Sequence, residues 1–516
     1  MKHASEAGRR AHLIAAILLG LLGTAIAIAT DLEDTELRGK QIFMSGTSTT
    51  GTPITALLGI DRTEIPASAA PCASCHGIDG RGRPEGGVIP SNITWSELSK
   101  GYGHEHDYGR RHPAFDEASL AVAITEGLDP AGNRLDVAMP HYRMAQDDVD
   151  ALIAYLKRLE YELDPGVGES TVQLATLLPL SGPAAPQGEA VHAVLTAFVQ
   201  QLNTGGGVNG RSIELQVIPL GGTPQQTVAN VREALQSGEI FALVAIYSQG
   251  AEAELATLLE EYEVPVIGPV SQAPAEAQKR SPQTFYLYAG NAELMRSLSQ
   301  FALSEGEQRR QVVVGPDNEL LGDVSDYVTA SLPYAVAEFD AAATASRVGA
   351  TDDVLFLGTV QELEQFLDLL AESTEVPRLL LPAATATPAL LGAPAVFNGR
   401  IFVGYPTLPG DVSESGRQSY ATLDAYGELP SGYFASQISA LAAAKVLVEA
   451  MQRSGHALNR ERLVAELEGM HRFATGLTPP ISYSLNRRVG ALGAHIVRLD
   501  LDAGRLVPIT AWQNLD

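Results

Sequence analysis

Cysteine is nearly absent from this chain, which has only two among its 516 residues. A framework of structural disulfides is therefore excluded, and so is a zinc site made of four thiolates. Basic residues are also scarce: 35 Lys and Arg stand against 61 Asp and Glu, giving a net charge of −26. This balance argues against nucleic acids and anionic membrane surfaces as partners. The chain is also too long for one ordinary hydrophobic core, so we expect at least two domains.

The two cysteines stand in one short segment, residues 72–76, with the sequence CASCH. Two thiols separated by two residues and followed by histidine are typical of covalent haem c attachment. Each thiol adds to one haem vinyl group, and the adjacent imidazole becomes the proximal iron ligand. We therefore expect one covalent haem on Cys72 and Cys75, with His76 on the iron. A redox or zinc Cys-x-x-Cys is the alternative, which the lack of a second thiol pair disfavours.

The first thirty residues have the pattern of a signal peptide. Lys2, Arg9 and Arg10 precede an uncharged apolar run over 13–29, which ends in small residues suited to cleavage. We expect cleavage near residue 30 and export to the periplasm, where cytochromes c mature. An uncleaved membrane anchor is the alternative, because the run is at the lower limit of a membrane span.

Residues 31–162 have the pattern of a small helical module. Residues 36–43 predict an amphipathic helix, and 147–157 predict a second one with acidic residues at its start. Its apolar positions follow helical spacing at Val149, Leu152, Ile153 and Leu156. Between the attachment motif and this helix lies Met139-Pro140.

This arrangement resembles the class I cytochromes c over the whole module. The resemblance implies an all-α domain in which Met139 is the distal iron ligand, opposite His76. A thioether favours reduced iron and raises the potential towards electron transfer. Met144 is the rival ligand.

Three further histidines, His104, His106 and His112, leave a bis-histidine haem or a separate metal site open. They fall in a glycine-rich stretch of mixed polarity, so we expect a loop with solvated histidines. Residues 77–82 predict a tight glycine loop after the attachment helix.

After a linker at 163–170, residues 171–516 alternate short apolar strands with longer helices, which is typical of α/β units around parallel sheets. The first series predicts strands at 172–178, 213–218, 241–246 and 265–268, with helices at 189–202, 225–237 and 252–262. The second predicts strands at 311–315, 354–358 and 378–381, with a helix at 362–370. Two series imply two lobes, with a ligand bound at the strand ends that face a cleft.

The order of these pieces resembles the type I periplasmic binding proteins, the branched-chain amino acid receptors of ABC transporters. The segments that carry the resemblance are PLSGP at 179–183, NTGGGVNG at 203–210, VPVIGP at 264–269, and the tail segments TGLTPPI at 475–481 and NRRVG at 486–490. The resemblance implies a two-lobed α/β domain that binds a small ligand.

Ligand residues carried over from this family lie in two loops of the first lobe: Ser248, Gln249 and Gly250, then Ser271 and Gln272. In the second lobe the family's aromatic residue before glycine is replaced by Leu321-Gly322. The family's carboxylate that holds the ligand ammonium aligns with Ala383. A buried ammonium would then lack compensation, so we expect a neutral or anionic organic ligand, not an α-amino acid.

No nucleophile elbow, P-loop or metalloprotease helix is present, so we do not expect an enzyme. The leading hypothesis is an exported electron carrier fused to a receptor for a small organic ligand, serving a periplasmic dehydrogenase and passing electrons towards an oxidase. A second hypothesis is the binding component of an ABC importer, in contact with a permease, with the haem as redox sensor or tether. A peroxidase-like open haem is a third, which a distal methionine disfavours.

Overall fold

The computed structural model describes residues 34–82, 88–106, 109–248, 250–270, 281–305, 309–315, 334–373, 375–386 and 388–515. The expected signal peptide at 1–30 lies outside this range. Contacts divide the chain after Glu162 into two compact units, each with its own hydrophobic core. We call them the cytochrome-like unit and the receptor-like unit, and each is described by itself.

Helices at the two ends of the cytochrome-like unit pack against each other. They are α2 (Asp34–Ser45) and α6 (Gln146–Arg158), each within about two residues of its expected bounds. Phe43 and Tyr155 meet at this crossing with ring centroids 5.5 Å apart, and both are fully buried. The other helices are α3 (Cys72–His76), α4 (Trp95–Leu98) and α5 (Glu117–Glu126).

The cytochrome-like unit also contains strands that we did not anticipate. An antiparallel sheet has the order β2-β1-β5, from β1 (Thr55–Leu58), β2 (Thr63–Pro66) and β5 (His141–Arg143). Strand β5 begins at His141, directly after Met139-Pro140, so its pairing with β1 fixes the chain immediately after these two residues. A two-stranded hairpin, β3 (His104–Glu105) with β4 (Arg111–His112), replaces the loop expected around the histidines.

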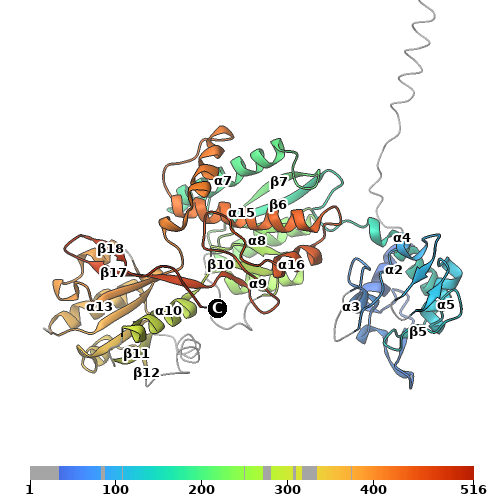
Figure 1. The fold of residues 1–516 in the computed structure, drawn as a ribbon, viewed down its shortest axis with the longest axis horizontal. Helices are drawn as coiled ribbons and strands as arrows, with labels where there is room; N and C mark the ends of the chain where they lie inside the picture. Colours follow the sequence, from blue (N-terminus) through green and yellow to red (C-terminus); the bar gives the residue numbers. More distant parts are fainter. Residues whose placement is uncertain are drawn as a thin grey trace, which may run out of the picture. The chain divides into compact units, whose positions relative to one another are not determined.

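The receptor-like unit has two α/β lobes (Figure 1). The sheet of the first lobe has the order β16-β10-β9-β8-β6-β7, and its ladders are parallel. Its strands are β6 (Thr171–Leu178), β7 (Ser212–Pro219), β8 (Ala242–Val244), β9 (Val266–Ile267), β10 (Thr284–Tyr288) and β16 (Val489–Ala491). Its helices are α7 (Ala185–Thr204), α8 (Pro224–Gln236), α9 (Glu252–Glu261), α14 (Glu414–Ala421), α15 (Phe434–Ser454) and α16 (Arg460–Glu468).

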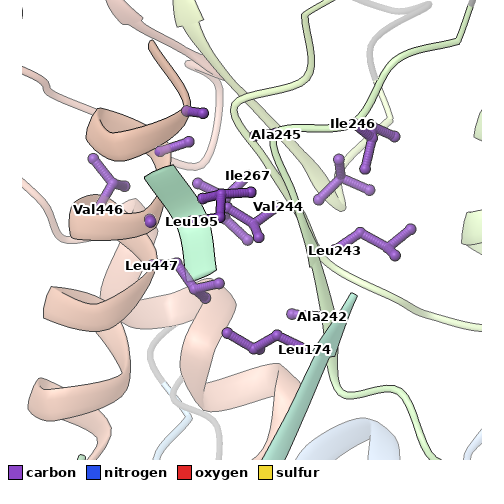
Figure 2. Close-up of a cluster of buried hydrophobic side chains, with 14 of the residues drawn as sticks. Leu174, Leu195, Ala242, Leu243, Val244, Ala245, Ile246, Ile267, Val446 and Leu447 are labelled. Carbon is purple, nitrogen blue, oxygen red and sulfur yellow. The ribbon is translucent and has the colours of Figure 1, made fainter. Parts of the chain in front are cut away.

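Aliphatic side chains from strands and helices meet in the core of this lobe (Figure 2). Leu174 comes from β6 and the run from Ala242 to Val244 from β8, Ala245 and Ile246 follow β8 directly, and Leu195 comes from α7. Val446 and Leu447 of α15 close the cluster and are fully buried. Helix α15 is long and apolar enough to span a membrane, but 67% of its most apolar window is buried, as in a core helix.

The sheet of the second lobe has the order β12-β11-β13-β14-β15-β17-β18, with β19 paired to β17. Strands β11 to β15 pair in parallel, whereas β17 runs antiparallel to β15. Its strands are β11 (Arg310–Gly315), β12 (Tyr334–Glu338), β13 (Asp352–Phe356), β14 (Arg378–Pro382), β15 (Ile401–Tyr405), β17 (Gly493–Asp500), β18 (Arg505–Pro508) and β19 (Gln513–Asn514). Its helices are α10 (Asn291–Ser304), α12 (Ala341–Ala345) and α13 (Val360–Ala371).

The segment that we expected to be a linker is mostly attached to the first lobe. Asp164 accepts a hydrogen bond from the backbone N–H of Arg460, and Gly166 accepts one from Gln173 N–H at 2.8 Å. On the other side, Glu162 accepts a hydrogen bond from the Tyr155 hydroxyl at 2.6 Å. Leu163 is thus the single residue between Glu162, which is bonded within the cytochrome-like unit, and Asp164, which is bonded within the receptor-like unit.

Candidate haem and ligand sites

The two cysteines lie on the short helix α3, which begins after Pro71 and ends at Gly77, where φ is 75°. Residues three apart share one face of a helix, so both thiols are presented on the same side. Cys75 is exposed and Cys72 is half-buried. Burial is the main cause that raises the pKa of the Cys72 thiol to about 12. This surface suits a planar group held by two thioether bonds.

The His76 ring is buried and has a defined tautomer. Its Nδ1 lies 2.9 Å from the carbonyl oxygen of Ser91. A carbonyl only accepts, so Nδ1 carries the hydrogen and Nε2 keeps a free lone pair. Burial lowers the pKa of His76, which favours the neutral imidazole. A neutral ring whose second nitrogen is fixed by a hydrogen bond is the usual form of a metal-ligating histidine.

The glycine loop expected after α3 places Ser91 beneath this ring. Gly77, Gly80 and Gly82 all have positive φ, as predicted. The carbonyl of His76 accepts a hydrogen bond from Gly82 N–H, and that of Gly80 accepts one from Ile93 N–H, each at 2.7 Å. These bonds bring the 91–93 segment back against the attachment helix.

Met139 and Met144 are both half-buried and pack against the core that also contacts Cys72 and Ala73. Met139 is held by a turn in which its N–H donates to Asp136 O at 3.0 Å. Three residues later, the Tyr142 hydroxyl donates to Ala70 O at 2.7 Å, two residues before Cys72. One buried tyrosine therefore ties the methionine segment to the attachment segment. A buried neutral imidazole, paired thiols and thioethers around one core fit a covalent haem c.

The expectation of solvated histidines was wrong for His112 of the β3–β4 hairpin, which is buried, whereas His104 and His106 are partly exposed. His112 is only 7% exposed, and its ring stacks on His104 with centroids 4.7 Å apart. His106 Nε2 lies 3.0 Å from His112 Nε2. Within the described residues, no group of three His, Cys, Asp or Glu side chains is arranged to hold a metal ion.

In the receptor-like unit, the first of the two loops expected to contact a ligand follows β8. Ala245 has a positive φ of 52°, which is uncommon for a residue with a Cβ. Ser248 follows and is buried, and its hydroxyl donates to Glu252 Oε1 at 2.7 Å. The N–H of Gly250 donates to the same oxygen at 3.1 Å. Gln249, Ser271, Gln272 and the pair Leu321-Gly322 lie outside the described residues.

Sequence reasoning missed Glu252 at this loop. Burial alone would raise the pKa of Glu252, but hydrogen bonds from Ser248 and the backbone hold it below its usual value. The carboxylate is therefore charged at neutral pH, and it already accepts the hydrogen bond that the Ser248 hydroxyl donates. The signal was present in the sequence as an acidic residue in the first turn of an expected helix.

The second lobe contributes an apolar strand end and a separate cavity. Ala383 follows β14 and packs against Ala289, Leu294 and Ala494. A cavity of about 520 Å³ adjoins Tyr405 at the end of β15. Its other lining residues are Leu408, Pro409, Gly410, Asp411, His495, Val497, Leu506, Pro508 and Thr510. Two tyrosines of the first lobe are also partnered or enclosed: Tyr247 is buried, and the Tyr288 hydroxyl lies 3.3 Å from Ser439 Oγ.

Family comparisons match both units. A family described as "Periplasmic binding protein" matches residues 171–505, and "Cytochrome c" matches residues 67–160. No match is found among curated proteins.

Solved structures resemble the receptor-like unit in fold. A fatty acid ABC transporter substrate-binding protein from Thermomonospora curvata is 18% identical with a TM-score of 0.53, covering 69% of this chain and 95% of its own. A branched chain amino acid ABC transporter protein from Thermus thermophilus with bound valine is 19% identical with a TM-score of 0.51, covering 67% and 97%. At such identities the likeness shows the fold alone.

The match over 171–505 spans more than half of the chain, and its strands and helices form the expected two lobes. The protein therefore belongs to the periplasmic binding protein family and carries a cytochrome c domain at its N-terminal side.

Proposed function

We propose that this protein is an exported c-type cytochrome whose receptor domain binds a small organic ligand in the periplasm. The observation that carries the proposal is the attachment helix, with two thiols on one face and a buried His76 whose Nδ1 is bonded to Ser91 O. Cys72 and Cys75 hold one haem c covalently, and His76 provides the proximal nitrogen. When bound, the haem supplies one-electron transfer.

Met139 is the proposed distal ligand, and Met144 remains its rival. Met139 follows the Asp136 turn and precedes β5, so the chain is held on both sides of its side chain. A neutral thioether would stabilise reduced iron and would compete with a peroxide for it. The chain's residues therefore favour electron transfer over peroxidase chemistry.

The receptor domain would take a ligand that is not an α-amino acid. Ser248, Gln249, Gly250, Ser271 and Gln272 are the proposed contacts. Ala383 supplies no charge for a ligand ammonium at that position, and the Ser248 hydroxyl is already bonded to Glu252. Because Glu252 is an anion at this loop, a neutral ligand is favoured over the anionic one that we also considered.

On this proposal, the protein would accept electrons from a periplasmic dehydrogenase of small organic substrates and deliver them towards an oxidase. The receptor domain captures the substrate or product, and the covalent connection raises the effective concentration of each domain near the partner of the other. The alternative is the binding component of an ABC importer, with the haem as redox sensor or tether. The likeness in fold to ABC transporter binding proteins supports this second function.

The first test is the optical spectrum of the oxidised protein matured in a periplasm with haem lyase. We expect the weak long-wavelength charge-transfer band of iron–thioether bonding. Met139→Ala should abolish it, whereas the matched variant Met144→Ala should retain it. A band lost only in Met144→Ala would transfer the distal role to Met144, and its absence from the wild type would reject thioether ligation.

The ligand class is tested by thermal denaturation of the full protein with valine, acetate and glycerol as probes. We expect no stabilisation by valine, because Ala383 carries no charge for its ammonium group, and none by acetate, because the Glu252 carboxylate beside Ser248 repels an anion. Glu252→Gln, which removes the carboxylate charge, should increase any response to acetate. Stabilisation of the wild type by valine would contradict the proposed ligand class.

A further inference from the structure

The cavity beside Tyr405 in the second lobe has no role in the proposed function. It measures about 520 Å³, which falls in the range of small-molecule sites, about 300–1,000 Å³. Its walls come from the end of β15, the following segment 408–411, the paired strands β17 and β18 (Figure 1), and Thr510. Ser248, the described contact of the first ligand loop, is not one of its lining residues. The cavity is therefore a separate place for a molecule to bind.

A carboxylate and an imidazole are paired in the wall of this cavity. His495 Nε2 lies 2.8 Å from Asp411 Oδ1 and 2.9 Å from Asp411 Oδ2, and both side chains are almost buried. Burial alone would raise the pKa of Asp411, but hydrogen bonds from His495 and from the Leu408 N–H hold it below its usual value. The carboxylate is therefore ionised and accepts, so His495 Nε2 carries a hydrogen. This pair fixes the orientation of the imidazole ring.

The other ring nitrogen of His495 is available to a bound molecule. Among the described residues, Nδ1 has no hydrogen-bond partner, yet it is not one of the atoms that are sealed from solvent. Only 9% of His495 is exposed, and the residue lines the cavity. The accessible Nδ1 therefore faces the cavity.

The Tyr405 hydroxyl is the second available group. Tyr405 pairs directly with His495 across β15 and β17, so the two side chains stand on the same face of the sheet. Burial raises the pKa of Tyr405, so the hydroxyl keeps its hydrogen at neutral pH. No described residue bonds to this hydroxyl, and it is also accessible to solvent. Two polar groups without protein partners thus belong to one wall of the cavity.

The lining of the cavity indicates a neutral ligand with an apolar body. Most other lining side chains are apolar: Leu408, Pro409, Val497, Leu506 and Pro508. The charge of Asp411 disfavours an anion, and the described lining includes no second acidic residue to hold a cation. A ligand hydroxyl suits His495 Nδ1 whether that nitrogen carries a lone pair or a hydrogen, because a hydroxyl both donates and accepts. For the same reason it can bond to the Tyr405 hydroxyl.

We propose that this cavity is a second binding site of the receptor domain, for a neutral organic molecule with an apolar body and a hydroxyl group. The ligand hydroxyl bonds to His495 Nδ1, on the ring that Asp411 holds in place, and the apolar body packs against Val497 and Leu506. This site adds a ligand to the one proposed for the loops at 248–250 and 271–272, and it does not depend on that proposal.

The test uses Trp512 as a reporter in the full protein. The chain has two tryptophans, and Trp95→Phe leaves Trp512 as the only one. The Trp512 indole donates to Pro406 O at 3.3 Å, one residue after Tyr405, so a molecule in the cavity changes its surroundings. With cyclohexanol as the probe, we expect a saturable change in Trp512 fluorescence.

Three variants in the Trp95→Phe protein locate the bound probe. His495→Gln can still donate towards Asp411 but offers no group in place of Nδ1, so cyclohexanol should bind about three- to tenfold more weakly. Leu506→Phe fills the cavity from β18 and should abolish the saturable change. The matched variant Val507→Phe adds the same bulk on the other face of that strand, because successive side chains alternate, and should retain the change.

The absence of a saturable change in the Trp95→Phe protein would overturn the proposal. So would a change that Leu506→Phe leaves intact, or one that Leu506→Phe and Val507→Phe reduce equally, because the probe would then bind elsewhere. An unaltered affinity in His495→Gln would reject the hydroxyl contact. None of these readouts involves the haem or the loops that carry Ser248 and Ser271, so failure here is distinguishable from failure of the proposed function.

Discussion

The attachment segment of the cytochrome domain and the first ligand loop of the receptor domain differ in how far apart their parts lie in the sequence. Cys72, Cys75 and His76 form one helix of five residues, so their chemistry is fixed by local spacing. The proposed ligand contacts of the receptor domain lie in two separate stretches of the sequence, and Ser248 is already bonded to Glu252. Sites of the first kind can be read from a motif. Sites of the second kind depend on which neighbours the fold supplies.

The interiors of the two domains also differ in the interactions that hold them together. In the cytochrome domain the two terminal helices, α2 and α6, pack against each other. In the second receptor lobe a buried cluster of charged side chains, Asp353 with Arg309 and Arg378, joins neighbouring strands of the sheet. If the domains fold independently, damage to either interior should stay in that domain.

The largest effect is expected for Asp353→Ala in the receptor domain. Asp353 is 1% exposed and pairs with Arg309 Nε at 2.6 Å and with Arg378 through two bonds of 2.7 Å. Removing this carboxylate leaves two buried guanidinium groups without their shared anion, at a cost of about 3–5 kcal/mol. Scanning calorimetry of the full protein should show the receptor transition at a lower temperature and the cytochrome transition unchanged.

The matched control is Asp352→Ala, next in the same strand. Asp352 pairs with Arg310, whose side chain is 51% exposed and remains hydrated when the partner is removed. We therefore expect a smaller loss than for Asp353→Ala. A joint shift of both transitions in either variant would show that the domains unfold as one unit.

An intermediate effect is expected for Gly39→Ala in the cytochrome domain. A Cβ at Gly39 would overlap the carbonyl of Ala151 and the side chain of Tyr155, so α2 and α6 must separate. We expect a loss of about 1–3 kcal/mol, although alanine is the better helix former. Haem absorbance recorded during unfolding in urea measures this loss in the free energy of unfolding. Gly101→Ala, where a Cβ meets nothing within 4 Å, is the control and should leave the transition unchanged.

Much of the architecture could be predicted from periodicity. Expected helix 147–157 is α6 (Gln146–Arg158), and expected strand 172–178 is β6 (Thr171–Leu178). Strands β1, β2 and β5 escaped prediction because they are three or four residues long, too short for alternation to be recognised. Their stability comes from pairing between segments that are distant in sequence.

The histidine hairpin shows why polar composition misled the prediction. Glycines and charged residues around His104 and His106 are typical of a solvated loop. In the structure, pairing of β3 with β4 stacks the rings, and Phe115 covers one of them. The role of Glu252 was not predicted for a related reason. The sequence places Glu252 in a helix but does not show that the Ser248 hydroxyl donates a hydrogen bond to it.

The smallest effect compares two buried tyrosines, one in each domain. Tyr142 in the cytochrome domain donates to Ala70 O at 2.7 Å, and Tyr483 in the receptor domain donates to Tyr286 O at 3.1 Å. Burial is the main cause that raises the pKa of both hydroxyls, so each remains a donor across the ordinary pH range. Tyr→Phe at either position removes one hydrogen bond, and we expect each to cost its own domain about 0.5–1.5 kcal/mol.

The two substitutions should differ in their effect on the haem, although their effects on stability are alike. Tyr142 joins the segment after Met139 to the segment before Cys72, so Tyr142→Phe releases a contact between the two proposed sources of haem ligands. The midpoint potential and the iron–thioether band should change in Tyr142→Phe and stay constant in Tyr483→Phe. Equal stability losses with no spectral difference would mean that the Tyr142 bond supports only the fold. A difference would show that the β5 strand positions Met139, a role that no local motif in the sequence predicts.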